Sequence, residues 1–164
     1  MGAPVPILPD EAPESPPEAP SPERQYALVE LGGYSLAVDV TRASQIIERP
    51  ALTPVPNTPE FIYGVCNVRG DIYSIVDLRH LLGFDPPGAD ASPDPLVILL
   101  RGPRYTCGAT IEGISELLWI RDDQIAAPTS EIPFISGLYR RERDTILVLD
   151  VDSLFDSPEM TQFQ

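Results

Sequence analysis

The sequence predicts an all-β fold, built as one β-barrel or as a pair of barrels. Apolar residues alternate with smaller or polar ones over many short runs, and turns containing Gly or Pro separate these runs. The stretches that favour helix are only a few residues long, which is typical of barrels. A chain of 164 residues, 43% of them hydrophobic, can bury a core, and its length suits one compact domain, undivided or split into two small lobes.

The composition argues against several classes of function. The net charge is −14, from 25 acidic and 11 basic residues, which disfavours an extended contact with nucleic acid or anionic lipid. All of the basic residues are Arg, so the chain lacks the lysine of a P-loop, of a Schiff base or of a general base. The single histidine, His80, cannot form a histidine cluster, and we expect neither a metal nor a cofactor.

The sequence also predicts a cytoplasmic protein without direct membrane insertion. No run approaches the roughly 20 apolar residues that a membrane-spanning helix needs, and the N-terminus lacks the charged and apolar regions of a signal peptide. Cys66 and Cys107 both fall within apolar strand patterns. We interpret them as small buried side chains, with a disulfide between them as the alternative.

The N-terminal part divides into a tail and the first strands. Residues 1–23 contain eight prolines, five acids and no basic residue, which predicts a disordered acidic tail. Residues 26–39 form a β-hairpin around Gly32-Gly33. Residues 41–47 favour either a short helix or an extended strand, and the prolines between 50 and 59 hold the next connection extended.

Residues 58–83 form the central unit of the chain, a β-hairpin between two short helical segments. Local signals for caps, turns and strand alternation agree throughout it. In order, its parts are Thr58 as the cap of a helical turn, a strand over Gly64–Arg69, a two-residue turn at Gly70-Asp71, a strand over Ile72–Val76, Asp77 as a helix cap, a helix over Leu78–Leu82, and Gly83 as its left-handed end.

The second half continues with hairpins. A polar, Pro-rich loop over residues 84–95 precedes them, and Glu112–Ile120 is compatible with strand or helix. The predicted hairpins pair Leu96–Arg101 with Tyr105–Ile111 around Gly102-Pro103, and Ser130–Tyr139 with Thr145–Val151 around a turn at 140–144. Asp152 is placed to cap a last short helix through Leu154 and Phe155, and residues 158–164 are expected to fray.

No group of residues combines a nucleophile, a base and an oxyanion donor. Asp77 is explained as a helix cap, and His80 follows it on a short, largely apolar helix as a structural histidine. The adjacent acids Asp122 and Asp123 are typical of a solvated turn. We therefore expect a protein that binds partners and is not an enzyme.

From Asn57 to Arg79 the chain has the pattern Asn-Thr-Pro-x-Phe-Ile-x-Gly-Val-x-Asn-Val-Arg-Gly-x-Ile-x-x-Ile-Val-Asp-Leu-Arg. This pattern resembles the signature of the CheW-like coupling proteins of bacterial chemosensory systems. Gly108-Ala-Thr-Ile-Glu-Gly-Ile-Ser-Glu-Leu-Leu is similar to a second recurring stretch of that family, and Phe134-Ile-Ser-Gly-Leu with Thr145-Ile-Leu-Val-Leu-Asp-Val is similar to a third. The resemblance implies a CheW-like domain over residues 24–160, followed by a frayed C-terminus at 161–164.

The resemblance implies two small SH3-like β-barrels packed side by side, with a few short helices. It also implies a non-catalytic scaffold that couples transmembrane chemoreceptors to a CheA-type histidine kinase, in chemotaxis or pilus motility. The partners would be the cytoplasmic hairpin tip of a receptor and the regulatory domain of the kinase, and they would associate the protein with membrane receptor arrays. The alternative is a stand-alone β-barrel module that binds and regulates the kinase without receptors.

The same resemblance indicates where a receptor would bind. An Arg at a β-turn suits the recognition of a carboxylate or a carbonyl, and the family arginine at the position of Arg69 is implicated in receptor contact. An internal salt bridge to Asp71, Asp77 or Glu48 is the alternative. The family usually has an acidic residue where Gln45 stands, which would alter partner specificity. The suspected receptor-binding residues, in a groove between the barrels, are Ala43, Gln45, Ile46, Val65, Asn67, Arg69 and Gly70.

Overall fold

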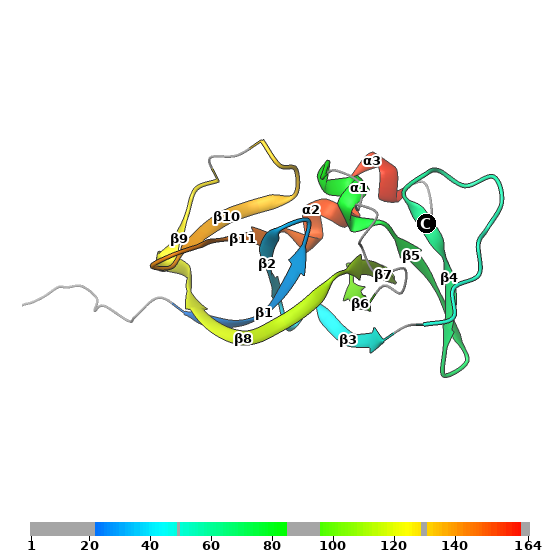
Figure 1. The fold of residues 1–164 in the computed structure, drawn as a ribbon, viewed down its shortest axis with the longest axis horizontal. Coiled ribbons are helices and arrows are strands. Elements are labelled where there is room, and N and C mark those ends of the chain that lie inside the picture. Colours follow the sequence, from blue (N-terminus) through cyan, green and yellow to red (C-terminus); the bar gives the residue numbers. More distant parts are fainter. Residues whose placement is uncertain (1–21, 49, 85–95, 129–130, 162–164) are drawn as a thin grey trace, which may run out of the picture.

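The computed structural model describes residues 22–48, 50–84, 96–128 and 131–161, which form two β-lobes side by side (Figure 1). This confirms the predicted all-β fold with a few short helices. Lobe 1 is a six-stranded sheet in the order β8-β1-β2-β11-β10-β9. Its strands are β1 Glu23–Leu31, β2 Tyr34–Asp39, β8 Gly113–Arg121, β9 Ile125–Ala126, β10 Ile135–Arg140 and β11 Thr145–Leu149.

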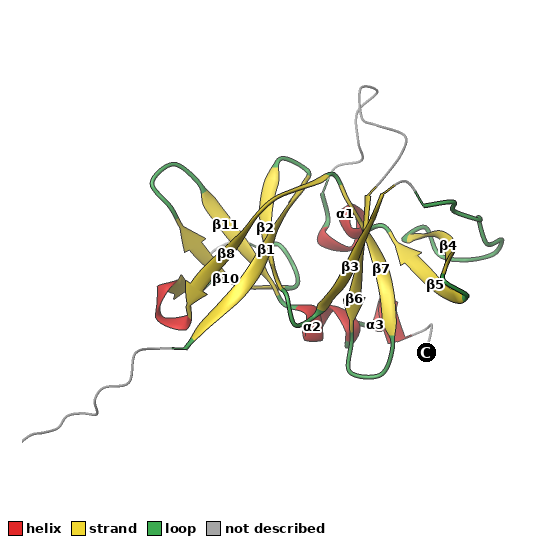
Figure 2. Cartoon of the chain, turned by 90° about the horizontal axis from the view of Figure 1, so that it is seen from below, coloured by secondary structure: helices red, strands yellow, loops and turns green. Residues whose placement is uncertain are grey.

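Lobe 2 is a five-stranded sheet in the order β3-β6-β7-β5-β4. The chain therefore starts in lobe 1, builds all of lobe 2 and then returns to complete lobe 1 (Figure 2). Parallel pairs of β11 with β2 and of β5 with β7 join the hairpins within each lobe. The strands of lobe 2 are β3 Ala43–Glu48, β4 Ile62–Val68, β5 Asp71–Val76, β6 Leu96–Arg101 and β7 Thr106–Ile111.

Each sheet curls so that its two edge strands approach one another. In lobe 2, the backbone of Thr53, in the connection between β3 and β4, forms two hydrogen bonds of 2.8 and 2.9 Å with Val65 of β4. In lobe 1, the edge strands β8 and β9 are separated only by a 3₁₀ turn, η1 Asp122–Gln124. Both lobes are thus barrel-like, and the sheet edges that would invite aggregation are largely covered.

The largest hydrophobic core lies between the lobes, and each barrel has a smaller core inside it. Tyr26, Leu28 and Ile120 belong to the core of lobe 1, and Cys66 and Ile75 belong to that of lobe 2. The shared core draws buried side chains from both sheets and from all three helices, among them Val29, Leu36, Leu78, Ile98, Leu100, Leu147, Leu154, Phe155 and Met160. Because most of the burial is shared, neither lobe has a complete core of its own.

Three short helices pack into this shared core. α1 Leu78–Leu82 matches the prediction, because the Asp77 side chain accepts hydrogen bonds from the Arg79 and His80 amides and Gly83 ends the helix at φ 75°. α2 Val151–Phe155 is capped by Asp150, which accepts from the Ser153 amide, so the prediction of Asp152 as the cap is wrong by two residues. The strand β11 ends at Leu149, which places Asp150 at the start of the helix.

Other sequence predictions are corrected near the chain ends and in the connections. Fraying from Pro158 is wrong, since Pro158–Thr161 forms α3 and its Met160 is only 2% exposed. Thr58 caps no helix, because residues 60–61 form a turn instead. Glu23 lies in β1 rather than in the predicted tail. Residues 1–21 of that tail, the loop at 85–95 and residues 162–164 lie outside the described residues.

Arg141, in the turn between β10 and β11, links that turn to β8 across lobe 1. Arg141 donates two hydrogen bonds to Asp144, at 3.2 and 3.0 Å, and a third of 3.1 Å to Glu116 of β8. This paired geometry raises the pKa of Arg141 and lowers that of Asp144. The turn is therefore held to β8 by charge as well as by the strand pairing.

Replacement of Asp144 by Asn is expected to lower the free energy of unfolding at neutral pH but not in strong acid. The hydrogen bonds from Arg141 hold the pKa of Asp144 below its ordinary value in the folded state. Such a carboxylate stabilises the fold above its unfolded-state pKa, and that stability is lost as the pH falls through its folded-state pKa. Urea unfolding of both proteins across this range measures the effect. The free energies of unfolding of the two proteins should therefore become equal in strong acid. Replacement of the exposed Glu142 by Gln in the same turn is the control, and its free energy of unfolding should follow that of wild type at every pH.

Candidate partner-binding surface

The turn between β4 and β5 places Arg69 at an exposed hairpin tip. Val68 pairs with Asp71, so the two turn residues are Arg69 and Gly70, with φ of 54° and 92°. Two positive φ values define a type I′ turn, in which Asn or Gly is favoured at the first position. The prediction of a Gly70-Asp71 turn is therefore wrong by one residue. The Asn67 side chain accepts a 2.9 Å hydrogen bond from the Gly70 amide and so supports the turn.

The side chain of Arg69 is exposed. Within the described ranges, none of the ion pairs joins it to Asp71, Asp77 or Glu48, which the sequence left as alternatives. A bulky residue held at positive φ costs about 1–3 kcal/mol of backbone strain. Because no ion pair in this part of the chain offsets that strain, Arg69 is a candidate for contact with a partner.

Ala43, Gln45 and Ile46 lie on the strand β3, which resolves the helix-or-strand alternative in favour of a strand. β3 pairs with β6, and a bulge between Ala43 and Gln45 shifts the register there. Ala43 and Ile46 are half-buried and pack against the shared core, so they lie at the boundary between the lobes. Gln45 is also half-buried. Of the two open alternatives, the extended strand is therefore the one that presents these three side chains.

The two groups of predicted residues sit on opposite edge strands of lobe 2. β3 and β4 are the first and last strands of its sheet, and Val65, Asn67, Arg69 and Gly70 lie on or just after β4. The curvature of the barrel nevertheless brings β3 and the β4–β5 turn to the same side of the molecule, the lower side in Figure 1. The β4–β5 hairpin stands on the part of lobe 2 remote from lobe 1, so Arg69 is not in a groove between the barrels (Figures 1 and 2).

An exposed apolar stripe on β8 extends this side of the molecule into lobe 1. Ile114, Leu117 and Trp119 are 44%, 58% and 58% exposed. They are paired with Val29, Ala27 and Gln25 of β1, which face away from the lobe 1 core residue Leu28. β8 runs along the lower side of Figure 1 towards β3. The sequence did not single out these residues, because apolar side chains on both faces of β8 leave no clear alternation.

A second apolar surface lies over β5, on the face of the β4–β5 hairpin where Ile72 stands beside its pairing partner Asn67. A hollow of about 360 Å³ is lined there by Ile62, Ile72, Val76, Tyr105 and Met160, among others. Ile72 is 62% exposed, the highest value for a large apolar side chain among the described residues. Exposed apolar patches on a folded domain commonly mark contact sites for other proteins.

The described residues offer little for chemistry. Cys66 and Cys107 are buried and unpaired, and burial raises the pKa of Cys107 to about 12, so its thiol is protonated and inert at neutral pH. His80 is exposed, and its ring lies 6.4 Å from that of Phe61. No group of three potential metal ligands occurs in the described ranges, and no helix there is long and apolar enough to cross a membrane.

Comparisons with known proteins agree with the geometry. A model of the CheW-like domain matches residues 25–159. The chemotaxis protein CheW of Klebsiella aerogenes is 28% identical over 142 residues, covering 84% of both chains. CheW of Thermotoga maritima is 28% identical and covers 77% of this chain and 84% of its own. The crystal structure of the scaffolding protein TtCheW from Thermoanaerobacter tengcongensis superposes with a TM-score of 0.74 at 23% identity, covering 86% of this chain and 96% of that one.

Proposed function

The chain belongs to the CheW-like family of chemotaxis coupling proteins, and we propose that it is a non-catalytic scaffold joining transmembrane chemoreceptors to a CheA-type histidine kinase. The observation that carries this proposal is the extent of the family match, residues 25–159, which spans both lobes and all three helices except the last residues of α3. A coupling protein needs two separate contact surfaces. The described residues present two exposed apolar areas that suit this role.

The receptor would lie along the lower side of Figure 1. This surface, which we call the receptor face, consists of Ile114 and Leu117 on β8, Ala43 and Ile46 on β3, and Arg69 at the hairpin tip. The tip of a receptor is a long antiparallel helical hairpin, and a rod of this kind matches an elongated face better than a pocket. Apolar contacts would supply affinity at the lobe boundary, and the guanidinium of Arg69 would bind a carboxylate or a backbone carbonyl.

The kinase would contact the hollow over β5. Its apolar lining comes from Ile62, Ile72, Val76, Tyr105 and Met160. Because the kinase regulatory domain is CheW-like, a barrel-to-barrel contact would bury this patch against a similar surface. Ile72, as the most exposed of these side chains, should dominate the energy of this contact.

Replacement of Arg69 by Asn is expected to weaken receptor binding about tenfold or more, while kinase binding stays within about twofold of wild type. Asn is favoured at positive φ in a type I′ turn, so this variant removes the guanidinium and keeps the hairpin. Its free energy of unfolding should equal or exceed that of wild type. Titration with a purified receptor cytoplasmic fragment and, separately, with the kinase regulatory domain measures both affinities. Charge reversal, Arg69→Glu, should weaken receptor binding further.

The matched control is Ile72→Glu, which places a charge in the hollow over β5. It should abolish kinase binding and leave receptor binding unchanged. Binding to the kinase alone by the wild-type protein, unaffected by either Arg69 variant, would favour the stand-alone module that regulates the kinase without receptors. Binding to neither partner would contradict the proposed function.

A further inference from the structure

The polypeptide passes between the two sheets at two places, and charged side chains span the lobe boundary at both. We name the first passage, Val40–Arg42 between β2 and β3, the first crossing. The second crossing is the single residue Glu112, between β7 and β8. Each crossing brings together groups from both lobes, and the contacts are directional, unlike those of the apolar shared core.

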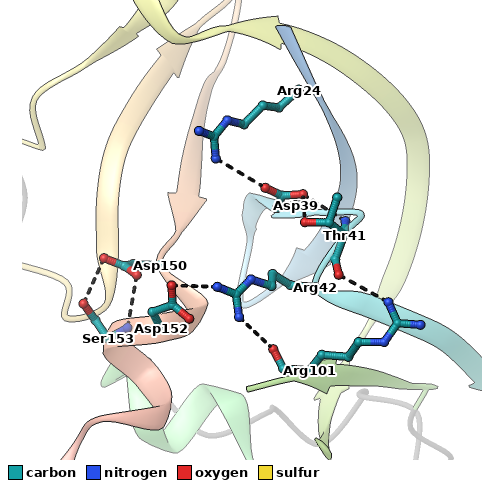
Figure 3. Close-up of polar contacts among 8 residues, drawn as sticks. All are labelled: Arg24, Asp39, Thr41, Arg42, Arg101, Asp150, Asp152 and Ser153. Carbon is teal, nitrogen blue, oxygen red and sulfur yellow. Dashed lines mark hydrogen bonds and ion pairs between the residues drawn. The ribbon is translucent and has the colours of Figure 1, made fainter. Parts of the chain in front are cut away.

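At the first crossing, Arg42 forms hydrogen bonds in two directions (Figure 3). Its Nη2 donates to Asp152 Oδ2 of α2 at 2.8 Å, and its Nη1 donates to the Arg101 carbonyl oxygen at the end of β6 at 3.2 Å. Arg101 also donates two hydrogen bonds to the first crossing. Its amide donates to the Arg42 carbonyl oxygen at 2.7 Å, and its Nη1 donates to the Thr41 carbonyl oxygen at 3.3 Å. The Asp39 carboxylate accepts from the Thr41 amide and hydroxyl and fixes the entry to the crossing.

At the second crossing, the Glu112 carboxylate holds one group from each lobe. Its Oε1 accepts from the Gly32 amide in the β1–β2 turn of lobe 1, at 3.3 Å, and its Oε2 accepts from Nη2 of Arg79 on α1 beside lobe 2. The Glu112 amide also donates to the Glu30 carbonyl oxygen of β1 at 2.8 Å. We call the side-chain contacts at each crossing a clamp, that of Arg42 at the first and that of Glu112 at the second. The side chains of Arg79 and Glu112 are 17% and 44% exposed, so the second clamp is partly shielded from water.

The two clamps lie at opposite ends of the β6–β7 hairpin. Arg101 pairs with Thr106 near the first crossing, and Leu96 pairs with Ile111 beside the second. Five residues of strand separate these pairs, which corresponds to roughly 17 Å. A single anchor would fix the two lobes at one point only, and the apolar contacts of the shared core are not directional. Two anchors at this spacing oppose rotation of one lobe on the other.

We propose that Arg42 and Glu112 are positioning residues that hold the two lobes in one relative orientation. A movement of the receptor bound at one surface would then be passed to the kinase bound at the other, and would not be lost in a twist between the lobes. The role in transmission rests on the proposed function, because the receptor face spans both lobes whereas the hollow over β5 lies on lobe 2 and its neighbouring helix. The orientation itself does not rest on that function. A scaffold whose lobes can twist would still bind the kinase through lobe 2, but would couple the two partners poorly.

The test measures the distance between the lobes in the full chain, without partners. Spin labels at cysteines introduced in place of the exposed Glu142 of lobe 1 and Glu60 of lobe 2 report this distance, and the buried Cys66 and Cys107 are shielded from the label. Pulsed dipolar spectroscopy should give a narrow distribution for wild type and one about twice as broad for Arg42→Met combined with Glu112→Ala. Arg121→Met is the matched control, because the ion pair of Arg121 with Asp123 stays at the end of β8 in lobe 1. It should leave the distribution narrow.

A second readout separates positioning from simple stability. The double variant should bind the isolated kinase regulatory domain, whose proposed contact lies on lobe 2, with an affinity within about twofold of wild type. It should lose several-fold in receptor-dependent kinase activation, and Arg42→Lys should restore part of that loss. An equally narrow distance distribution in the double variant would overturn the inference. If the wild type bound neither partner, the proposed function would fail, and the distance measurement would still decide whether the clamps set the orientation. The single variants are measured in the same way, which keeps the test valid if the double variant folds poorly.

Discussion

Replacement of Phe155 by Ala is expected to lower the free energy of unfolding by about 3–5 kcal/mol, the range for deleting a buried aromatic ring. Phe155 is 1% exposed, ends α2 and lies in the core that the two lobes share. Its ring meets that of Tyr105 edge to face, with the centroids 5.0 Å apart. The β6–β7 turn packs directly on it, since a Cβ added at Gly102 would lie 2.3 Å from Phe155 Cδ1. Such a closely lined site cannot collapse to fill the space left by the ring.

Urea unfolding followed in each lobe separately tests this expectation. The fluorescence of Trp119 reports lobe 1, and the reactivity of Cys66 and Cys107 towards a thiol reagent reports lobe 2. Both transitions should move together to lower urea with unchanged slope, because both lobes depend on the same core. The control Phe84→Ala removes a half-buried ring that stacks on the exposed Tyr34, and should cost about 1–2 kcal/mol. Separation of the two transitions in the Phe155 variant would show that the lobes are stable independently.

Elements whose signals are local could be predicted from the sequence. Gly32-Gly33 defined the first hairpin, and Asp77 with Gly83 defined α1, because caps and turns depend on a few adjacent residues. α3 could not be predicted, since four residues carry no periodicity and the helix forms because Met160 is buried in the shared core. The pairing of β11 with β2 could not be predicted from local sequence signals either, because it joins residues more than a hundred positions apart.

The candidate surface was predicted in part. The family signature pointed to Arg69, but its turn was placed one residue late because a bulky side chain is disfavoured at the first position of a type I′ turn. The signature also pointed to Ala43 and Ile46, whose strand was ambiguous because it lies at a sheet edge and buries only part of each side chain. The apolar stripe on β8 became visible only in the folded structure, where Leu117 and Trp119 are each 58% exposed.

Replacement of Gly64 by Ala is expected to destabilise the protein by about 2–4 kcal/mol, because backbone strain and a backbone clash act together. Gly64 has φ 153°, and a Cβ there would lie 2.8 Å from the Thr53 carbonyl oxygen. That carbonyl accepts the Val65 amide, one of the two hydrogen bonds that close the barrel of lobe 2. The added methyl group would force the connection away from β4. Amide hydrogen exchange should therefore accelerate at Thr53 and Val65 before it does so in the lobe 1 core.

The same substitution at Gly70 separates the two causes. Gly70 also has positive φ, 92°, but no atom lies within 4 Å of the position that a Cβ would occupy. Gly70→Ala therefore carries only the conformational cost, about 1 kcal/mol, and should leave exchange at Thr53 and Val65 unchanged. If the two alanine variants lost equal stability, the approach of Thr53 would not be the reason that glycine is required at position 64. A larger loss at Gly64, with faster exchange at the Thr53–Val65 bridge, would show that the close approach of the Thr53 carbonyl requires glycine at position 64. That approach would then be what holds β4, and with it the Arg69 turn, in position.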